Sequence, residues 1–362
     1  MFIDSLELSK YRNYENLNIS FDPGITILYG DNAQGKTNIL EALYIAGTTK
    51  SHRGSKDKDI IKFDEEEAHI RLKTTKNDIG HKIDVHLRKN KNKYIAIDGI
   101  SIKKSGELLG LINMIFFSPE DLSIIKNGPS QRRRFMNLEL CQLNKLYFYN
   151  YINYNKALEQ RNTLLKQIAS DNKLKDTLDI WDDYIIQYGI EVIKERQHFI
   201  DRLNEIVKVI HDHLTGGREK IEIKYEKNVS IEDYEKVLQK KRDIDMRYQS
   251  TQTGPHRDDM CFYINGIDVR TYGSQGQQRT AALSLKLAEI ELVKSIINDT
   301  PVLLLDDVMS ELDSNRRNYL LESIKDIQTV VTCTGYDDFI KSRLTIDKIY
   351  EAINGSIKEM NI

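Results

Sequence analysis

The sequence predicts an α/β fold in which a P-loop ATPase lobe is interrupted by a second, mainly helical lobe. A glycine-rich loop at residues 30–37 lies between an apolar strand pattern and a helical pattern. A second apolar stretch, residues 301–305, ends in two carboxylates, and a charge-laced helical region from about 130 to 214 separates the two. The beginning and the end of the chain are therefore expected to build one lobe, and its middle the other.

The glycine-rich loop fits the phosphate-binding pattern G-x-x-x-x-G-K-[ST], with Lys36 and Thr37 as its last two residues. Its glycines let successive backbone N–H groups turn toward phosphate oxygens, and the positive end of the following helix faces the same anion. Lys36 is placed for the β- and γ-phosphates, and Thr37 is placed for Mg²⁺. The loop therefore predicts binding of a nucleoside triphosphate with Mg²⁺.

Strand and helix patterns frame this loop. Residues 2–28 contain three strand patterns, residues 66–100 alternate as a meander, and residues 112–117 form a buried strand. A helix that stops at Gly47 is expected behind the loop, because four apolar residues share one face: Ile39, Leu40, Leu43 and Tyr44. A further helix is expected to begin with Ser130 as its N-cap.

Two carboxylates end the strand at residues 301–305. Asp306 is expected to hold the Mg²⁺ that Thr37 also ligates, and Asp307 is expected to lie beside the attacking water. A second loop of small residues, at 273–277, opens another helix and is therefore a second candidate anion site. The chain thus carries one P-loop but two loops suited to phosphate.

Charge is balanced over the chain, with 53 basic and 55 acidic residues, so that any nucleic-acid surface must be a local patch. Three basic segments are candidates, in this order: Arg132–Arg134, Lys89–Lys93 and His52-Arg53. The three arginines lie at the helix end that the macrodipole makes unfavourable for cations, which favours an anion partner. A solvated loop is the alternative interpretation of the other two segments.

Several other groups have two interpretations. Arg12 and Asn13, between the first two strands, either reach the nucleotide or form a polar turn. Aromatic residues of the helical region either stack on bases or pack in a helical core: Tyr147, Tyr151 and Tyr154. A metal site is suggested, without a complete set of ligands, by His256, Asp258 and Asp259. The three cysteines are far apart and no apolar run approaches the ~20 residues of a membrane span, so we expect a soluble, cytoplasmic protein.

Two stretches resemble ABC-type ATPases. Residues 273–277 are similar to their signature loop and residues 310–313 to their D-loop, while the inserted helical region resembles the SMC-like branch of that class. From residue 2 to about 335, the chain is similar to the RecF family of bacterial recombination mediators. Seven stretches carry this resemblance: Lys10–Tyr14, Gly30–Asn38, Ser51–Arg53, Ser118–Leu122, Arg132–Phe135, Thr253–Asp259 and Leu305–Val308.

The resemblance implies an ATP-dependent homodimer that binds single-stranded, double-stranded and gapped or junction DNA. With RecO and RecR it would load recombinase onto single strands, in DNA replication, recombinational repair and SOS induction. Lys36 and Asp307 would be catalytic, Thr37 and Asp306 would hold Mg²⁺, and Ser274 would reach the γ-phosphate in trans. The ATP site in cis would include Arg12, Asn13, Gly30, Asp31, Asn32, Ala33, Gln34, Gly35, Lys36, Thr37 and Asn38. The ATPase lobe would comprise residues 1–117 and 296–362, and the helical lobe, which ends in the signature, residues 118–295.

Three departures from the ABC pattern imply slow hydrolysis. Asp307 stands where a longer Glu is usual, Ser118–Asp121 stands where a Gln is usual, and Thr332–Thr334 stands where a His is usual. We expect a weak, DNA-stimulated ATPase that acts as a dimerisation switch. The alternatives are a structural SMC-type DNA clamp head, which needs a far longer coiled coil, and a transporter ATPase subunit, which should have the Gln and the His.

Overall fold

The computed structural model describes residues 1–335 and 346–360, which fall into two compact units. Unit 1 comprises residues 1–121 and 289–362, and unit 2 comprises residues 122–288. The division at residue 288 falls within one continuous helix, α10 (Gln275–Ile297). Within the described ranges, none of the helices combines the length and apolar character that a membrane span requires.

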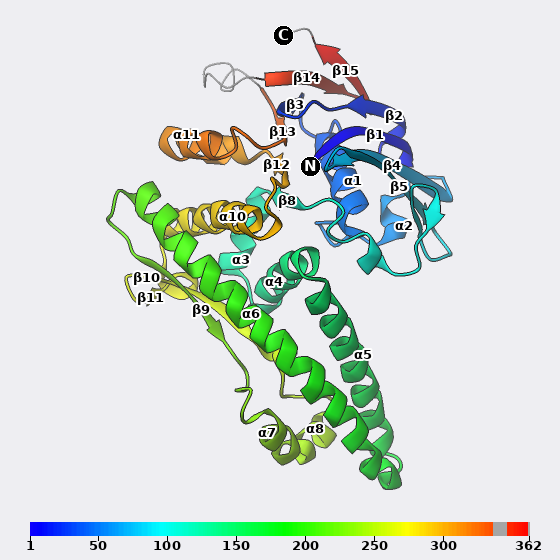
Figure 1. Ribbon diagram of the computed structural model, residues 1–362, viewed down its shortest axis with the longest axis vertical. Helices are drawn as coiled ribbons and strands as arrows, with labels where there is room; N and C mark the ends of the chain where they lie inside the picture. Colours follow the sequence, from blue (N-terminus) through cyan, green and yellow to red (C-terminus); the bar gives the residue numbers. More distant parts are fainter. Residues whose placement is uncertain (336–345, 361–362) are drawn as a thin grey trace. The chain divides into compact units, whose positions relative to one another are not determined.

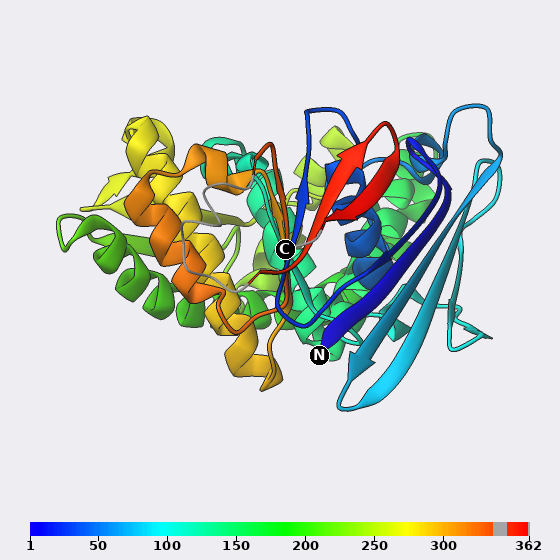
Figure 2. The ribbon, with the colours of Figure 1, turned by 90° about the horizontal axis from the view of Figure 1, so that it is seen from above.

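Unit 1 contains two six-stranded sheets with helix α1 (Lys36–Thr48) between them (Figures 1 and 2). The first sheet is an antiparallel meander with the order β2 (Tyr14–Ser20), β1 (Phe2–Tyr11), β4 (Glu67–Lys76), β5 (Ile79–Arg88), β6 (Tyr94–Ile97) and β7 (Ile100–Ser101). The second has the order β15 (Ser356–Met360), β14 (Ile346–Ile353), β3 (Ile25–Tyr29), β13 (Thr329–Cys333), β12 (Val302–Asp306) and β8 (Met114–Phe117). Short helices α2 (Asp57–Ile60) and α11 (Ser314–Ser323) complete the unit.

In the second sheet of unit 1 all strands except β15 are parallel. Parallel strands bring their carboxyl ends to one edge of a sheet, and ligands of open α/β sheets bind at that edge. The loops after β3, β12 and β8 therefore meet there, although they lie far apart in the sequence.

Helix α1 differs from its prediction in two ways. It is buried on all sides rather than on one face, because both sheets pack on it. It also continues past Gly47 to Thr48, and Thr49 closes it in the left-handed conformation with φ 67°. Gly47 is instead a packing residue, since a Cβ there would lie 2.8 Å from the sulfur of Met114.

Unit 2 is mainly helical, which confirms the predicted class of α/β fold with a helical insertion. Helices α5 (Lys145–Ile168) and α6 (Leu178–Thr215) run side by side as an antiparallel hairpin (Figure 1). Unit 2 also contains α3 (Leu122–Lys126), α4 (Pro129–Leu143), α7 (Tyr234–Lys240), α8 (Arg242–Tyr248), α9 (Val269–Tyr272) and a sheet of β11 (Ile267–Asp268), β10 (Asp259–Ile264) and β9 (Ile221–Glu226). Of these, α4, α7, α8 and β9 pack on the hairpin.

Two predictions for unit 2 concern its helices. Tyr147 and Tyr154 are buried, so they pack in the core of the helical region and cannot stack on bases.

The N-cap of α4 is Gly128 with Pro129 as the first helical residue, rather than Ser130. Proline is suited to this first position because its missing N–H would have no partner there.

Charged side chains are buried inside the helical hairpin. The Arg161 guanidinium is fully buried and donates from Nε to Asp182 at 2.5 Å and from Nη1 to Asp245 at 2.7 Å. Nη1 also contacts the hydroxyl of Thr251 at 2.9 Å. These contacts join α5, α6 and α8 around one arginine.

Candidate nucleotide-binding site

The loop after β3 has the conformation that its glycines predict. Gly30 and Gly35 have φ angles of 143° and 105°, in the region that disfavours side chains. A Cβ would also lack space, lying 2.6 Å from the Ala352 carbonyl at Gly30 and 2.4 Å from the Asn13 amide at Gly35. Both positions therefore require glycine for conformation and for close approach.

A cavity of about 440 Å³ opens in front of the loop. It is lined by residues from five segments of unit 1: Asn32, Ala33, Gln34, Gly35, Lys36, Thr37, Asn38, Arg53, Ser118, Pro119, Glu120, Asp306, Asp307 and Thr332. The predicted loop and the two carboxylates after β12 thus line one pocket.

Lys36 lies across the inside of the loop. Its ammonium group donates to the carbonyls of Gly30 at 2.6 Å and of Asp31 at 2.7 Å. Burial lowers the pKa of Lys36, and the carboxylates of Asp307 and Asp306 oppose that shift. The lysine is a cation held beside the space that phosphate oxygens would occupy.

Thr37 and Asp306 meet although 269 positions separate them. The Thr37 hydroxyl donates to the Asp306 carboxylate at 2.7 Å, and the Thr332 hydroxyl contacts the same oxygen at 2.7 Å. A hydroxyl and a carboxylate are the hard oxygen ligands that Mg²⁺ prefers. The residues therefore fit a magnesium ion beside the P-loop.

Asp307 follows in the left-handed conformation with φ 52°. Its backbone N–H donates to the Thr332 hydroxyl at 3.0 Å, and its side chain lines the cavity. Strained backbone of this kind at the end of a strand is typical of functional positions, because the surrounding structure must hold it.

Arg12 and Asn13 contribute to the site in different ways. Asn13 touches the loop directly: its amide donates to the Gln34 carbonyl at 3.1 Å and accepts from Asn38 at 2.8 Å. Arg12 is instead paired with the buried Glu41 of α1, through Nε and Nη2 at 2.9 Å each. Arg12 thus braces the helix behind the loop and does not line the cavity.

Sequence reasoning did not place five residues of this cavity in the nucleotide site: Arg53, Ser118, Pro119, Glu120 and Thr332. Arg53 was considered as a DNA contact or part of a solvated loop, and the other four belong to segments that stand where ABC enzymes have Gln or His. The signal for Thr332 was its place at the end of an apolar strand, β13, which pairs with the strand that carries Asp306. The Ser51 hydroxyl, at 2.5 Å from Glu41, fixes the segment that presents Arg53.

Ser274 lies in unit 2, in the loop between α9 and α10. Its side chain is exposed, and its hydroxyl accepts from the backbone N–H of Gln277 at 3.2 Å. Gln277 in turn accepts from the backbone N–H of Ser274 at 3.0 Å. These reciprocal hydrogen bonds form the start of α10 and leave the loop open to solvent.

The predicted DNA segments differ in exposure. Arg132 is only 2% exposed and makes a two-pronged salt bridge to Asp259, at 2.6 and 2.7 Å, so the prediction that it leads the DNA surface is wrong. The anion partner expected for the arginines is here a carboxylate of the same unit. In the Lys89–Lys93 tip, the two end lysines pair with Glu66 and Asp57.

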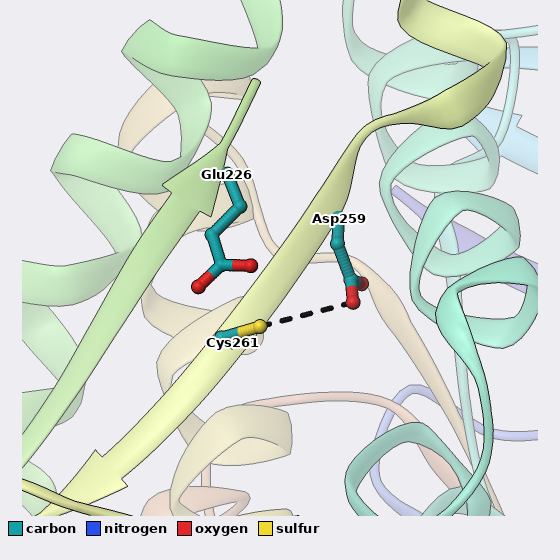
Figure 3. A group of neighbouring side chains, drawn as sticks. All are labelled: Glu226, Asp259 and Cys261. Atoms are coloured by element: carbon teal, nitrogen blue, oxygen red, sulfur yellow. Dashed lines mark hydrogen bonds between the residues drawn. The ribbon is translucent and has the colours of Figure 1, made fainter. Parts of the chain in front are cut away.

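The carboxylates near His256 are also engaged by the protein itself. Asp258 is bound by Arg196 at 3.3 Å and by the Tyr225 hydroxyl, so it does not face an ion. In the described chain, the ligand atoms of Glu226, Asp259 and Cys261 cluster within 4.8 Å of one another (Figure 3). Asp259 is already neutralised by Arg132, which argues against a metal at this cluster.

His256 is held as a neutral imidazole in unit 2. Its Nδ1 lies 2.6 Å from the Tyr154 hydroxyl and its Nε2 lies 2.9 Å from the Thr251 carbonyl. A carbonyl can only accept, so Nε2–H donates to it and Nδ1 accepts from the tyrosine. Burial lowers the pKa of His256 from 6.5 to about 4.

This pKa predicts acid sensitivity of unit 2. The unfolded chain protonates His256 below pH 6.5, whereas the folded chain protonates it only near pH 4. Neutral His256 therefore contributes fully to the free energy of unfolding above pH 6.5, and this contribution is lost as the pH falls from 6.5 to about 4. We expect a loss on the order of 3 kcal/mol across this window. Urea unfolding followed by the fluorescence of Trp181, the only tryptophan, measures it within unit 2.

His256→Gln is the control for this pH profile, because glutamine keeps a hydrogen-bonding side chain but does not titrate. Burial raises the pKa of Asp258 and Asp245, so protonation of these carboxyl groups favours the folded state as the pH falls. This effect opposes that of His256 and is present in both the wild type and the variant. The difference between the two profiles therefore isolates the histidine. Identical profiles for variant and wild type would contradict the assignment.

Known proteins resemble this chain over almost its whole length. Residues 2–356 match the family described as RecF/RecN/SMC N terminal domain. A DNA replication and repair protein RecF from Lachnoclostridium phytofermentans is 58% identical over 359 residues, covering 99% of this chain and 100% of the relative. The solved structure of the recombination mediator protein RecF-ATP in the RecFOR pathway superposes with a TM-score of 0.93 at 37% identity, covering 99% of this chain and 98% of that chain. An Smc head domain from Pyrococcus furiosus, with a TM-score of 0.58 at 17% identity over 100% of this chain and 96% of that chain, shares the fold.

Proposed function

Because the chain belongs to the RecF family within the RecF/RecN/SMC N terminal domain proteins, we propose that it is an ATP-dependent DNA-binding protein of DNA replication and recombinational repair. The observation that carries this proposal is the 2.7 Å contact between Thr37 and Asp306, which joins the P-loop to the strand with two carboxylates. A RecF relative of similar fold has been solved with ATP. The cavity of unit 1 is accordingly the ATP site.

The residues of the P-loop, the two carboxylates and Arg53 each have a role toward ATP. Gly30–Asn38 surround the phosphates with backbone N–H groups, and Lys36 leaves the loop carbonyls to bind the β- and γ-phosphates. Thr37 and Asp306 hold Mg²⁺, which neutralises phosphate charge when it is bound. Asp307 orients the attacking water, and Arg53, which also lines the cavity, supplies a second cation to the phosphates.

ATP acts as a dimerisation switch in this proposal. Ser274 of one protomer binds the γ-phosphate held by the other, so ATP stabilises the dimer by contacting both copies, and hydrolysis removes these contacts. Hydrolysis is slow, because Asp307 has a short reach and because Glu120 and Thr332 stand on the cavity wall where ABC enzymes have Gln and His. A weak, DNA-stimulated ATPase suits a switch of this kind.

The dimer acts at gapped or junction DNA. With RecO and RecR it helps to load recombinase onto single-stranded DNA, and it takes part in SOS induction. Contacts to phosphates give DNA affinity that depends little on sequence and falls steeply with salt. A structural clamp head is the weaker candidate, because the hairpin of unit 2 is formed by helices of 24 and 38 residues rather than by a long coiled coil.

Sedimentation velocity tests the proposal on the purified full chain. We expect a monomer mass without nucleotide or with ADP-Mg²⁺, and a dimer mass with ATP-Mg²⁺ that a gapped duplex stabilises further. An ungapped duplex of the same length is the control for DNA structure. The same sedimentation mass under all nucleotide conditions would contradict the proposed dimerisation switch. A DNA affinity that does not change with salt concentration would contradict the proposed contacts to phosphates.

A further inference from the structure

We infer that the turn between β14 and β15, Asn354–Gly355, is a positioning element of the nucleotide site. The inference rests on the proposed function of the cavity as an ATP site. It concerns a part of unit 1 that follows the P-loop by more than 300 positions and that does not itself line the cavity. The turn acts from behind the loop and determines whether its N–H groups keep the phosphate-binding arrangement.

The first contact of the turn is a hydrogen bond to a loop side chain. The backbone N–H of Asn354 donates to the Gln34 side-chain oxygen at 2.6 Å. Gln34 is the residue before Gly35 and Lys36, where the loop bends into α1. The bond therefore fixes the loop directly before α1 begins.

The second contact is a close backbone approach at the start of the loop. Strand β14 pairs with β3 up to Tyr29, and directly beyond this pairing Gly30 lies against the carbonyl of Ala352. A Cβ on Gly30 would be 2.6 Å from that oxygen. The chain just before the turn thus forms the wall behind the first glycine of the loop.

The third contact joins the turn to the other segment that supports the loop. An ideal Cβ on Gly355 would lie 2.6 Å from the Asn13 carbonyl, so Gly355 and the backbone of Asn13 are in contact. Asn13 in turn holds the Gln34 carbonyl and the Asn38 side chain. The turn therefore contacts the loop directly through Asn354 and Gln34, and also through Gly355 and Asn13.

The same unit contains a matched turn without these contacts. Asp98 and Gly99, between β6 and β7, have φ angles of 53° and 81°, and Asn354 and Gly355 have 48° and 73°. A Cβ on Gly99 would meet no atom within 4 Å. The two turns share their backbone conformation and differ in what lies behind the glycine.

The experiment compares Gly355→Asn with Gly99→Asn. Asparagine tolerates the left-handed conformation better than other residues with a side chain, so both variants should keep the turn. They differ in what the new side chain meets, which is the Asn13 backbone at position 355 and open space at position 99. We expect Gly355→Asn to raise the dissociation constants of fluorescent ATP and ADP analogues alike by about tenfold, because the P-loop binds phosphates common to both. Gly99→Asn should leave both constants unchanged. The close contact at Gly355 also predicts a lower Tm for Gly355→Asn than for Gly99→Asn, so circular dichroism must show that both variants are folded at the temperature of the binding assay.

A second variant approaches the contact from the loop. Gln34→Met keeps the length of the side chain but removes the acceptor for Asn354, and it leaves the turn itself intact. If the turn acts through this loop, the double variant Gln34→Met/Gly355→Asn should weaken ATP binding less than the product of the single effects. The inference would be overturned if the double variant raised the dissociation constant of ATP by the full product of the two single effects. It would also be overturned if Gly355→Asn bound ATP as tightly as Gly99→Asn. A wild type that binds neither nucleotide would instead overturn the proposed function as a whole.

Discussion

Ser274→Arg is expected to remain monomeric in ATP-Mg²⁺ while it still binds the nucleotide. Ser274 is exposed at the start of α10, where its hydroxyl accepts from Gln277 at 3.2 Å. A serine here can present its hydroxyl and the helix N-terminus to a phosphate of the other protomer, whereas the long arginine side chain fills the space for that phosphate. We expect the dissociation constant of the ATP-bound dimer to rise at least about a hundredfold, or ~3 kcal/mol.

Two control variants separate this effect from simpler ones. Lys36→Met should lose nucleotide affinity and dimerisation together, because it removes the cation inside the P-loop. Ser170→Arg places the same charge and bulk on an exposed loop residue between α5 and α6, and should dimerise as wild type does. Sedimentation with ATP-Mg²⁺, paired with a fluorescent nucleotide titration, distinguishes the three. A Ser274→Arg protein that dimerises normally would show that the loop does not contact the partner's nucleotide.

Arg161→Met should destabilise unit 2 by roughly 3–5 kcal/mol. The guanidinium is fully buried between Asp182 and Asp245, whose side chains are 3% and 0% exposed. Methionine fills a similar volume but removes the Arg161 salt bridge from the buried Asp245 carboxylate and leaves Asp182 with only the partly exposed Arg242 as its cation. Urea unfolding followed by Trp181 fluorescence measures the loss, since this tryptophan precedes Asp182 in the same helix.

Arg242→Met is the matched control for this prediction. Arg242 contacts Asp182 as well, but its side chain is 23% exposed, so water can replace it. A partly exposed pair of this kind is typically worth no more than ~1 kcal/mol. Equal losses for the two variants would show that the Arg161 network carries no special stability.

The fold and the centre of the site were predictable because their signals are local. The spacing from Gly30 to Thr37, and an apolar strand that ends in Asp306, are properties of short segments that one function constrains. In the structure the first of these segments follows β3 and the second is β12, and these two are parallel strands of one sheet.

The remaining features depend on neighbours that no local pattern reveals. The sequence suggests that Gly47 ends a helix, but in the folded chain Gly47 leaves room for the Met114 side chain. Arg132 reads as a surface cation until Asp259, 127 positions away, is found to bind it. Thr332 reads as a missing histidine until its hydroxyl is found on the carboxylate of Asp306. In each case a contact made in the folded chain overrides the residue's usual preference.

The interleaved construction of unit 1 has a consequence for the growing polypeptide on the ribosome. Strand β3, which leads into the P-loop, has both of its sheet neighbours in β13 and β14, so it is translated some 300 residues before them. Unit 2 is translated in between as one continuous segment that can complete its own contacts first. Such long-range pairing is slow to form and leaves an unpaired strand exposed in the meantime. A nascent or prematurely terminated chain therefore has no ATP site, and only a nearly complete polypeptide can join the nucleotide-driven cycle.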